Sequence, residues 1–231
     1  MKQTAQAAKG NQTLDQLTGI APQLPLDIVV VLDRSGSMQS IREDSTGAYN
    51  SFIAEQQAQP GEANITLAIF DHEYEILQDR ANLKDAMLLN NENFVPRGWT
   101  ALYDAIGNTI NKFKKLRDEG KVDGVIFTIL TDGEENRSTE FKLADIKSMI
   151  EIAEKEFGWQ FVYLGANQDA FSVGATFGLA AAACATYDTN SDGLKFASAK
   201  MSADSTMYRS TYYDLKAEKF KNQDQAQTSS N

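Results

Sequence analysis

Four short runs of mainly apolar residues constrain the fold of this chain more than any other feature of its sequence. Each run is short, rich in β-branched or aromatic residues, and followed by polar residues. Runs of this kind are typical of strands that are buried on both faces, as in a parallel sheet covered by helices. The four runs are Ile28–Leu32, Ile65–Phe70, Val125–Leu130 and Phe161–Leu164.

Amphipathic stretches that are long enough for helices separate or follow these runs. Strands that alternate with helices of this length predict right-handed βαβ units and therefore a mostly parallel sheet. The expected helices cover Ser40–Gln57, Leu102–Arg117, Lys142–Glu156 and roughly 198–219, with a shorter one at Leu83–Leu89.

Two weaker strands complete the expected sheet. Tyr74–Leu77 follows the second apolar run after the turn sequence Asp71-His72-Glu73, which indicates a hairpin and one antiparallel edge strand. A further strand is expected near Ala182–Thr186. The predicted fold class is α/β: a Rossmann-like, doubly wound, mostly parallel six-stranded sheet with one antiparallel edge strand and helices on both faces.

The composition of the chain indicates one domain flanked by two polar ends. Residues 1–24 form a polar arm, with at most a short helical turn around Leu14 and Leu17, and residues 221–231 have the composition of a disordered tail. Residues 25–220 contain no internal repeat and no linker, which predicts a single domain.

The charge and the cysteine content exclude several classes of protein. A net charge of −10 and a pI near 4.7 argue against nucleic acid and anionic membranes as main partners. No signal-peptide pattern and no apolar run of membrane-spanning length occur, so the expected location is cytoplasmic, and an intracellular phage or host protein fits the same facts. The single cysteine, Cys184, lies among alanines and is expected to be a small buried residue.

Hydroxyl and carboxylate side chains gather where two of the buried runs end. The first run leads into Asp33, Ser35 and Ser37, the third leads into Asp132, and a loop between them carries Thr100. In open α/β sheets such strand ends meet in a crevice where ligands bind. A plainer interpretation is that the same residues only cap the helices that follow them.

These five side chains offer only oxygen atoms to a ligand. Three neutral hydroxyls and two carboxylates, without histidine or cysteine, select hard cations, so Mg²⁺ is expected, with Mn²⁺ or Ca²⁺ as alternatives. A divalent ion between two carboxylates is formally neutral. It can therefore attract an Asp or Glu side chain of another protein even though this chain is acidic.

The segment Asp33-Arg34-Ser35-Gly36-Ser37, with Thr100 in "RGWTAL" and Asp132 in "LTDGEEN", resembles the metal-ion-dependent adhesion site of von Willebrand factor type A domains. The resemblance extends over about residues 25–220. It implies that Ser35, Ser37 and Thr100 contact the metal directly, and that Asp33 and Asp132 act through water or switch between roles. The later segment "FVYLGANQDAF" resembles the intracellular bacterial and phage branch, which includes tellurite-resistance-associated proteins.

Two residues near this motif have open roles. His72, in the expected hairpin turn, is interpreted as an exposed turn residue rather than a metal ligand or base. Trp99 precedes Thr100 directly and is expected to pack the loop rather than to serve as an exposed recognition residue.

Two acidic segments after the expected strands are also open to more than one interpretation. Glu134 and Glu135 either tune the rim of the site or belong to a solvated acidic loop. Asp188–Gly193 resembles the opening of a calcium-binding loop, but Ala199 stands where the bidentate glutamate is required, so a solvated turn is expected.

The functional expectation is a metal-dependent protein-binding module and not an enzyme. No nucleophile elbow, Walker loop or dinucleotide-binding glycine pattern occurs, and a metal alone supplies neither a base nor an activated water. Two alternatives remain: a structural or assembly protein, such as a phage virion component with a secondary metal site, and a Mg²⁺-dependent phosphoester hydrolase.

Overall fold

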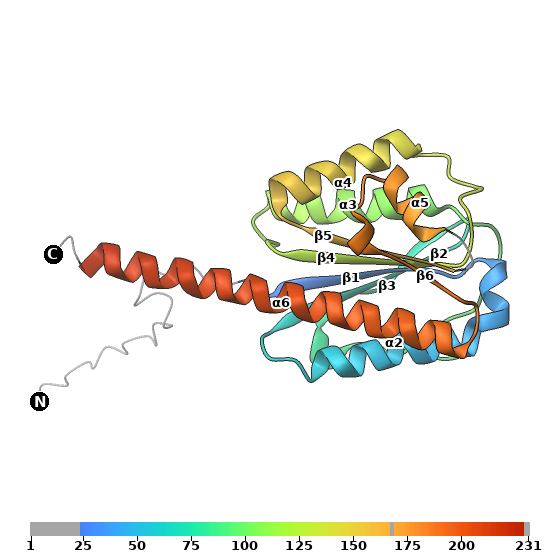
Figure 1. The fold of residues 1–231 in the computed structure, drawn as a ribbon, viewed down its shortest axis with the longest axis horizontal. Coiled ribbons are helices and arrows are strands. Elements are labelled where there is room, and N and C mark those ends of the chain that lie inside the picture. The colour runs from blue at the N-terminus through green and yellow to red at the C-terminus, as the bar shows by residue number, and fades with distance from the viewer. Residues whose placement is uncertain (1–23, 167–168, 229–231) are drawn as a thin grey trace, which may run out of the picture.

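The computed structural model describes residues 24–166 and 169–228, and it contains a single sheet (Figure 1). The strands are β1 (Leu26–Asp33), β2 (Ala63–Phe70), β3 (Tyr74–Asn82), β4 (Val125–Thr131), β5 (Gln160–Ala166) and β6 (Cys184–Tyr187). The helices are α2 (Arg42–Gln57), α3 (Leu102–Asp118), α4 (Leu143–Phe157), α5 (Ala170–Thr176) and α6 (Ser191–Thr228), with 3₁₀ turns η1 (Gly36–Ile41), η2 (Leu83–Asp85) and η3 (Ala181–Ala183).

The strand order β3-β2-β1-β4-β5-β6 gives a mostly parallel sheet with one antiparallel edge. β1 pairs in parallel with β2 on one side and with β4 on the other. The chain runs from β1 to β2 and β3 on one side and then crosses back past β1 to β4, which places a topological switch point between β1 and β4. The predicted fold class, including the antiparallel edge strand, is confirmed.

Helices cover both faces of the sheet because the central strands are apolar on both sides. Ile28, Val30 and Leu32 of β1 face a core shared with α2 and α6, whereas Val29 and Val31 face a core shared with α3, α4 and α5. Successive side chains of a strand alternate between the faces, so an unbroken apolar run fills both cores. This arrangement leaves the polar residues that follow β1 and β4 at the edge of the sheet.

Several boundaries differ from those expected from the sequence. The short helix predicted over Leu83–Leu89 is only the 3₁₀ turn η2, and α5 was not predicted because its seven residues are too few to show a helical period. Helix α6 starts seven residues before the expected position and continues to Thr228, into the segment expected to be a disordered tail. Five of the eight residues 221–228 are lysine, glutamine or alanine, which favour helices.

In Figure 1 the C-terminal part of α6 extends beyond the sheet. The helical turn expected around Leu14 and Leu17 lies outside the described residues. Over the part of the chain that the structure describes, no helix combines the length and the hydropathy needed to cross a bilayer.

Candidate metal centre

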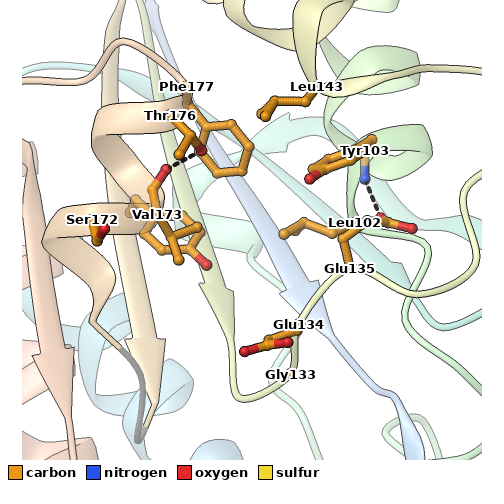
Figure 2. Close-up of a pocket in the computed structure, with 11 residues that line it drawn as sticks. Leu102, Tyr103, Gly133, Glu134, Glu135, Leu143, Ser172, Val173, Thr176 and Phe177 are labelled. Carbon is orange, nitrogen blue, oxygen red and sulfur yellow. Dashed lines mark hydrogen bonds between the residues drawn. The ribbon is translucent and has the colours of Figure 1, made fainter.

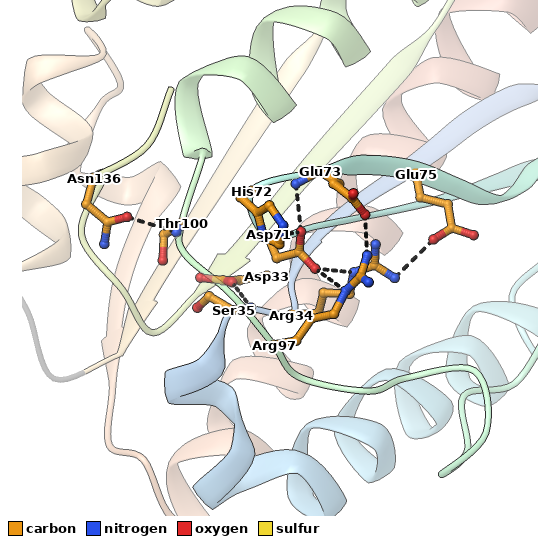
Figure 3. Close-up of polar contacts among 10 residues, drawn as sticks. All are labelled: Asp33, Arg34, Ser35, Asp71, His72, Glu73, Glu75, Arg97, Thr100 and Asn136. Carbon is orange, nitrogen blue, oxygen red and sulfur yellow. Dashed lines mark hydrogen bonds and ion pairs between the residues drawn. The ribbon is translucent and has the colours of Figure 1, made fainter. Parts of the chain in front are cut away.

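The structure brings the five predicted site residues together at the switch point between β1 and β4. Asp33 is the last residue of β1, and Ser35 and Ser37 follow it in the turn that opens η1. Asp132 directly follows β4, and Thr100 lies just before α3 (Figure 3 shows Asp33, Ser35 and Thr100). The order of the strands alone makes the ends of β1 and β4 neighbours, as predicted.

Short contacts connect the site residues of these two strand ends. The Ser37 hydroxyl donates to Oδ1 of Asp132 at 2.7 Å, and the hydroxyl oxygens of Ser35 and Ser37 are 3.0 Å apart. Oδ1 of Asp33 accepts the backbone N–H of Ser35 at 2.6 Å, which fixes the turn between them. Both serine hydroxyls therefore lie beside the carboxylate of Asp132.

Gly133 shows that Thr100 belongs to the same cluster. A Cβ atom added to Gly133 would lie 3.0 Å from Oγ1 of Thr100 and 3.7 Å from Oδ2 of Asp33. The Thr100 hydroxyl and the Asp33 carboxylate consequently approach the same point beside the β4 end. A side chain at position 133 would fill the space into which both oxygens point, so glycine leaves that space accessible.

Burial destabilises the charged forms of the two carboxylates in the cluster. Asp33 is 0% exposed, and its burial raises the pKa of its carboxyl group to about 6, although the Thr131 hydroxyl donates to Oδ2 at 2.6 Å. Burial also raises the pKa of Asp132, and the Ser37 hydrogen bond opposes that change. Two partly or fully buried acids side by side are an arrangement that a bound cation would stabilise.

Backbone hydrogen bonds hold the loop that carries Thr100 against the β1 end. The N–H of Arg97 donates to the carbonyl of Arg34 at 2.8 Å, and the N–H of Gly36 donates to the carbonyl of Gly98 at 3.2 Å. On the other side, the N–H of Thr100 donates to the side-chain oxygen of Asn136 at 3.0 Å. Thr100 is thus fixed from both neighbouring loops without the use of its own hydroxyl.

Asp71 is a structural residue of the site that the sequence analysis missed. It is completely buried, and its carboxylate contacts Nε of Arg34 at 3.1 Å, Nε of Arg97 at 2.8 Å and Nδ1 of His72 at 3.2 Å (Figure 3). Its backbone carbonyl accepts the N–H of Ala101 at 2.8 Å. Asp71 therefore joins the β1 turn to the Thr100 loop. Its position directly after β2 repeats the pattern of Asp33 and Asp132, and this signal could have identified it.

Asp71, His72 and Glu73 also form a cluster whose possible ligand atoms lie within 4.8 Å of one another. Two guanidinium groups already neutralise it, since Arg34 contacts Asp71 and Arg97 contacts both Asp71 and Glu73. Positive charges in these positions oppose the binding of a cation. Among the residues that the structure describes, no Lys or Arg side chain contacts the oxygen cluster at the β1 and β4 ends, so this cluster is the better candidate for a metal site.

The other residues discussed from the sequence have mixed outcomes. His72 is an exposed turn residue and Cys184 is buried, as expected. The prediction that Trp99 packs the loop is wrong, because this residue is 64% exposed, whereas Phe94 earlier in the same loop is buried.

The segment that resembles a calcium-binding loop is a turn at the start of α6. Asn190 accepts the N–H of Gly193 at 2.9 Å and caps the helix, which agrees with a turn rather than a calcium loop.

Glu134 and Glu135 differ in their surroundings although they are adjacent. Glu135 accepts the N–H of Tyr103 at 2.9 Å and those of Arg137 and Ser138, so it caps α3 and orders the following loop. Glu134 is exposed. Only Glu134 is therefore available at the rim of the site.

The donor set fits a hard divalent cation. Ser35, Ser37 and Thr100 supply hydroxyl oxygens, and Asp33 and Asp132 supply carboxylates, within one connected cluster. Mg²⁺ prefers oxygen ligands and usually requires only one or two carboxylates from a protein. The residues present would hold such an ion without a nitrogen or sulfur ligand.

Comparison with known proteins gives structural relatives but no sequence family. Neither a protein-family model nor a curated protein matches the chain. Among solved structures, proximal thread matrix protein 1 from the mussel byssus is 15% identical, with a TM-score of 0.56 over 80% of this chain and 46% of that chain. The vWF domain of the pilus tip protein Mfa5 from Porphyromonas gingivalis is 11% identical, with a TM-score of 0.54 over 80% and 96% of the two chains.

A von Willebrand factor type A protein from Catenulispora acidiphila is 14% identical, with a TM-score of 0.52 over 78% of this chain and 43% of that chain. The chain thus spans less than half of the mussel and Catenulispora proteins. Together with the strand order, these likenesses define the fold as that of a von Willebrand factor type A-like domain.

Proposed function

We propose that this domain binds a protein partner through a divalent cation, with Mg²⁺ as the ion and an Asp or Glu of the partner as its last ligand. One observation carries the proposal: five oxygen-bearing side chains from three separate segments converge at the adjacent ends of β1 and β4. Protein binding is also the general role of domains with this fold. The fold relatives are too distant in sequence to supply a partner or a pathway.

In this proposal the residues of the site divide into two roles. Ser35, Ser37 and Thr100 contact the ion through neutral hydroxyls, while Asp33 and Asp132 neutralise it from positions fixed by hydrogen bonds. A bound Mg²⁺ supplies the positive charge that draws a carboxylate to an acidic protein. Neutral direct ligands leave that charge less compensated, so the ion retains affinity for an acidic partner.

The hydrogen bonds made by Asp33 and Asp132 favour a role in recognition over a role in hydrolysis. Asp33 is held by two hydrogen bonds, and Asp132 by the Ser37 hydroxyl, so neither is positioned as a free general base. The exposed Trp99 beside Thr100 supplies a contact of the kind that dominates binding energy at protein interfaces. We therefore propose a binding module without catalytic activity.

Removal of single hydroxyls tests the metal site. Thr100→Ala and Ser37→Ala are each expected to weaken Mg²⁺ binding by at least about tenfold, as measured by calorimetry, because each removes a ligand atom. The Thr100 hydroxyl makes no hydrogen bond among the described contacts, so its loss should leave the fold intact. Ser40→Ala is the matched control, since Ser40 is an exposed serine of the same 3₁₀ turn that bonds only the Ser37 carbonyl. Equal Mg²⁺ affinity in all three variants would refute the proposed ligands.

Partner binding is tested by affinity capture with native lysate in Mg²⁺ and in excess EDTA. The protein recovered in Mg²⁺ is expected to disappear in EDTA and with Thr100→Ala. Trp99→Ser is expected to reduce recovery while it leaves the calorimetric Mg²⁺ affinity unchanged, because Trp99 is exposed and carries no candidate ligand. Equal recovery in EDTA would show that binding does not pass through the ion.

A further inference from the structure

A pocket of about 290 Å³ opens beside the candidate metal centre and has no role in it. It lies between the start of α3, the loop after β4, and α5, with Tyr103 and Val173 on opposite sides and Glu134 at one end (Figure 2). Leu102, Leu143, Val173 and Phe177 form its apolar walls. Its volume is at the lower end of the range for small-molecule sites, about 300–1,000 Å³, and suits one large side chain.

The walls of the pocket are held by packing that does not depend on a ligand. Phe177 is 1% exposed, and its ring packs edge-to-face against Tyr103, with centroids 6.1 Å apart, and against Tyr163 at 5.5 Å. The first turn of α3 is fixed by the hydrogen bond from the Tyr103 N–H to Glu135. The pocket is therefore preformed, which reduces the entropy lost on binding.

Glu134 gives the pocket a negative charge that the chain does not neutralise. Glu134 lines the pocket and is exposed, and across residues 24–166 and 169–228 it takes part in no ion pair or hydrogen bond. Its neighbour Glu135 is instead saturated by three backbone N–H groups and the Ser138 hydroxyl. An apolar cavity that ends in one free carboxylate matches a side chain with an apolar stem and a cationic head.

The pocket adjoins the metal centre through Gly133. This glycine lines the pocket, and a Cβ atom on it would lie 3.0 Å from Oγ1 of Thr100. The metal centre and the pocket are therefore close enough for one partner segment to contact both. One short segment can place two side chains, one in each site.

We propose that this pocket receives an arginine side chain of the same partner whose carboxylate completes the metal site. The aliphatic stem packs against Leu102 and Val173, and the guanidinium lies between the Tyr103 ring and the Glu134 carboxylate. The role of the pocket as a specificity site rests on the proposed function. The pocket itself binds arginine whether or not a metal is present.

The test uses the full chain with labelled leucine and valine methyl groups, observed by NMR in EDTA. Titration with N-acetyl-arginine methylamide is expected to give saturable shifts of the Leu102, Leu143 and Val173 methyl signals. The citrulline analogue, which has the same shape without the charge, is expected to bind about fivefold more weakly, the size of one partly exposed ion pair. Glu134→Gln should lower arginine affinity to the citrulline value, whereas Glu156→Gln, a matched exposed glutamate at the end of α4, should not change it.

Three results would overturn the proposal. They are no saturable shift of these methyl signals, equal affinities for the arginine and citrulline compounds, or tighter binding of N-acetyl-leucine methylamide than of the arginine compound. The metal-free conditions separate this outcome from that of the proposed function. If arginine binds but calorimetry detects no Mg²⁺ binding, the arginine pocket is supported and the proposed metal site is refuted. If Mg²⁺ binds but arginine does not, the partner is recognised through its carboxylate alone.

Discussion

Asp33→Asn is expected to stabilise the domain in EDTA at pH 7 and to abolish its stabilisation by Mg²⁺. Burial raises the pKa of Asp33 to about 6, so the folded protein holds this proton more tightly than the unfolded chain does. The free energy of unfolding therefore falls as the pH rises from about 4 to about 6, and the loss persists above pH 6. A pKa about two pH units above its ordinary value corresponds to roughly 3 kcal/mol.

Asparagine suits the hydrogen bonds of this position. Its side-chain oxygen can accept the Ser35 N–H, and its NH₂ group can donate to the Thr131 hydroxyl, which already contacts the Gly133 carbonyl at 3.1 Å. The variant should thus gain up to about 3 kcal/mol in EDTA at pH 7 and nothing at pH 4. Because the two proteins share all other titrating groups, the difference between their free energies of unfolding at each pH reports the contribution of Asp33.

Magnesium should remove most of this difference. At a Mg²⁺ concentration 100 times its dissociation constant, the unmodified protein is expected to gain about 2.7 kcal/mol, and the variant much less. Urea unfolding at pH 4, 5, 6 and 7, with EDTA or Mg²⁺, measures both effects. Equal stabilisation of the two proteins by Mg²⁺, or a variant that is less stable in EDTA at pH 7, would contradict this account of Asp33.

Arg209→Met is expected to cost about 1–3 kcal/mol of stability without a change in Mg²⁺ affinity. Arg209 is 2% exposed, and its guanidinium donates to the carbonyls of Gln56, Pro60 and Gly61 at 2.7–3.1 Å. These carbonyls lie at or just beyond the end of α2, where backbone oxygens lack helical partners and a positive charge is favourable. Methionine has a similar length but cannot donate to these carbonyls, so the hydrogen bonds that the guanidinium makes to them are lost.

Arg209 lies far from the candidate metal site in the topology of the sheet. Gly61 precedes β2, whereas the site lies at the opposite ends of the parallel strands. Lys195→Met is the control on the same helix, because Lys195 is exposed and pairs only with Asp192; its loss should change stability by less than about 0.5 kcal/mol. Similar losses in both variants, measured by urea unfolding, would show that Arg209 is not an anchor of α6.

The strands and the oxygen cluster could be predicted because their signals are local or follow from strand order. The apolar side chains of the run Ile28–Leu32 point alternately to both faces of the strand, so they are buried only if helices cover both faces of the sheet. Once β1 and β4 are parallel neighbours, the residues that follow them must meet, which fixes Asp33 and Asp132.

The residues that could not be predicted depend on contacts between distant segments. Arg209 meets the end of α2 across about 150 positions of sequence, and no spacing rule connects them. Trp99 is exposed although its neighbour Thr100 and Phe94 of the same loop are buried, a difference that the sequence alone does not indicate. The pocket beside Gly133 depends on α5, which is too short for its period to be recognised.

Anomalous diffraction from a crystal grown with Mn²⁺ tests the central claim most directly. Mn²⁺ accepts the same oxygen ligands as Mg²⁺ and marks its own position. We expect one strong peak in contact with the hydroxyl oxygens of Ser35, Ser37 and Thr100, next to Asp132. A peak at Asp71, His72 and Glu73 instead, or no peak at the ends of β1 and β4, would contradict the claim that these strand ends form a metal site.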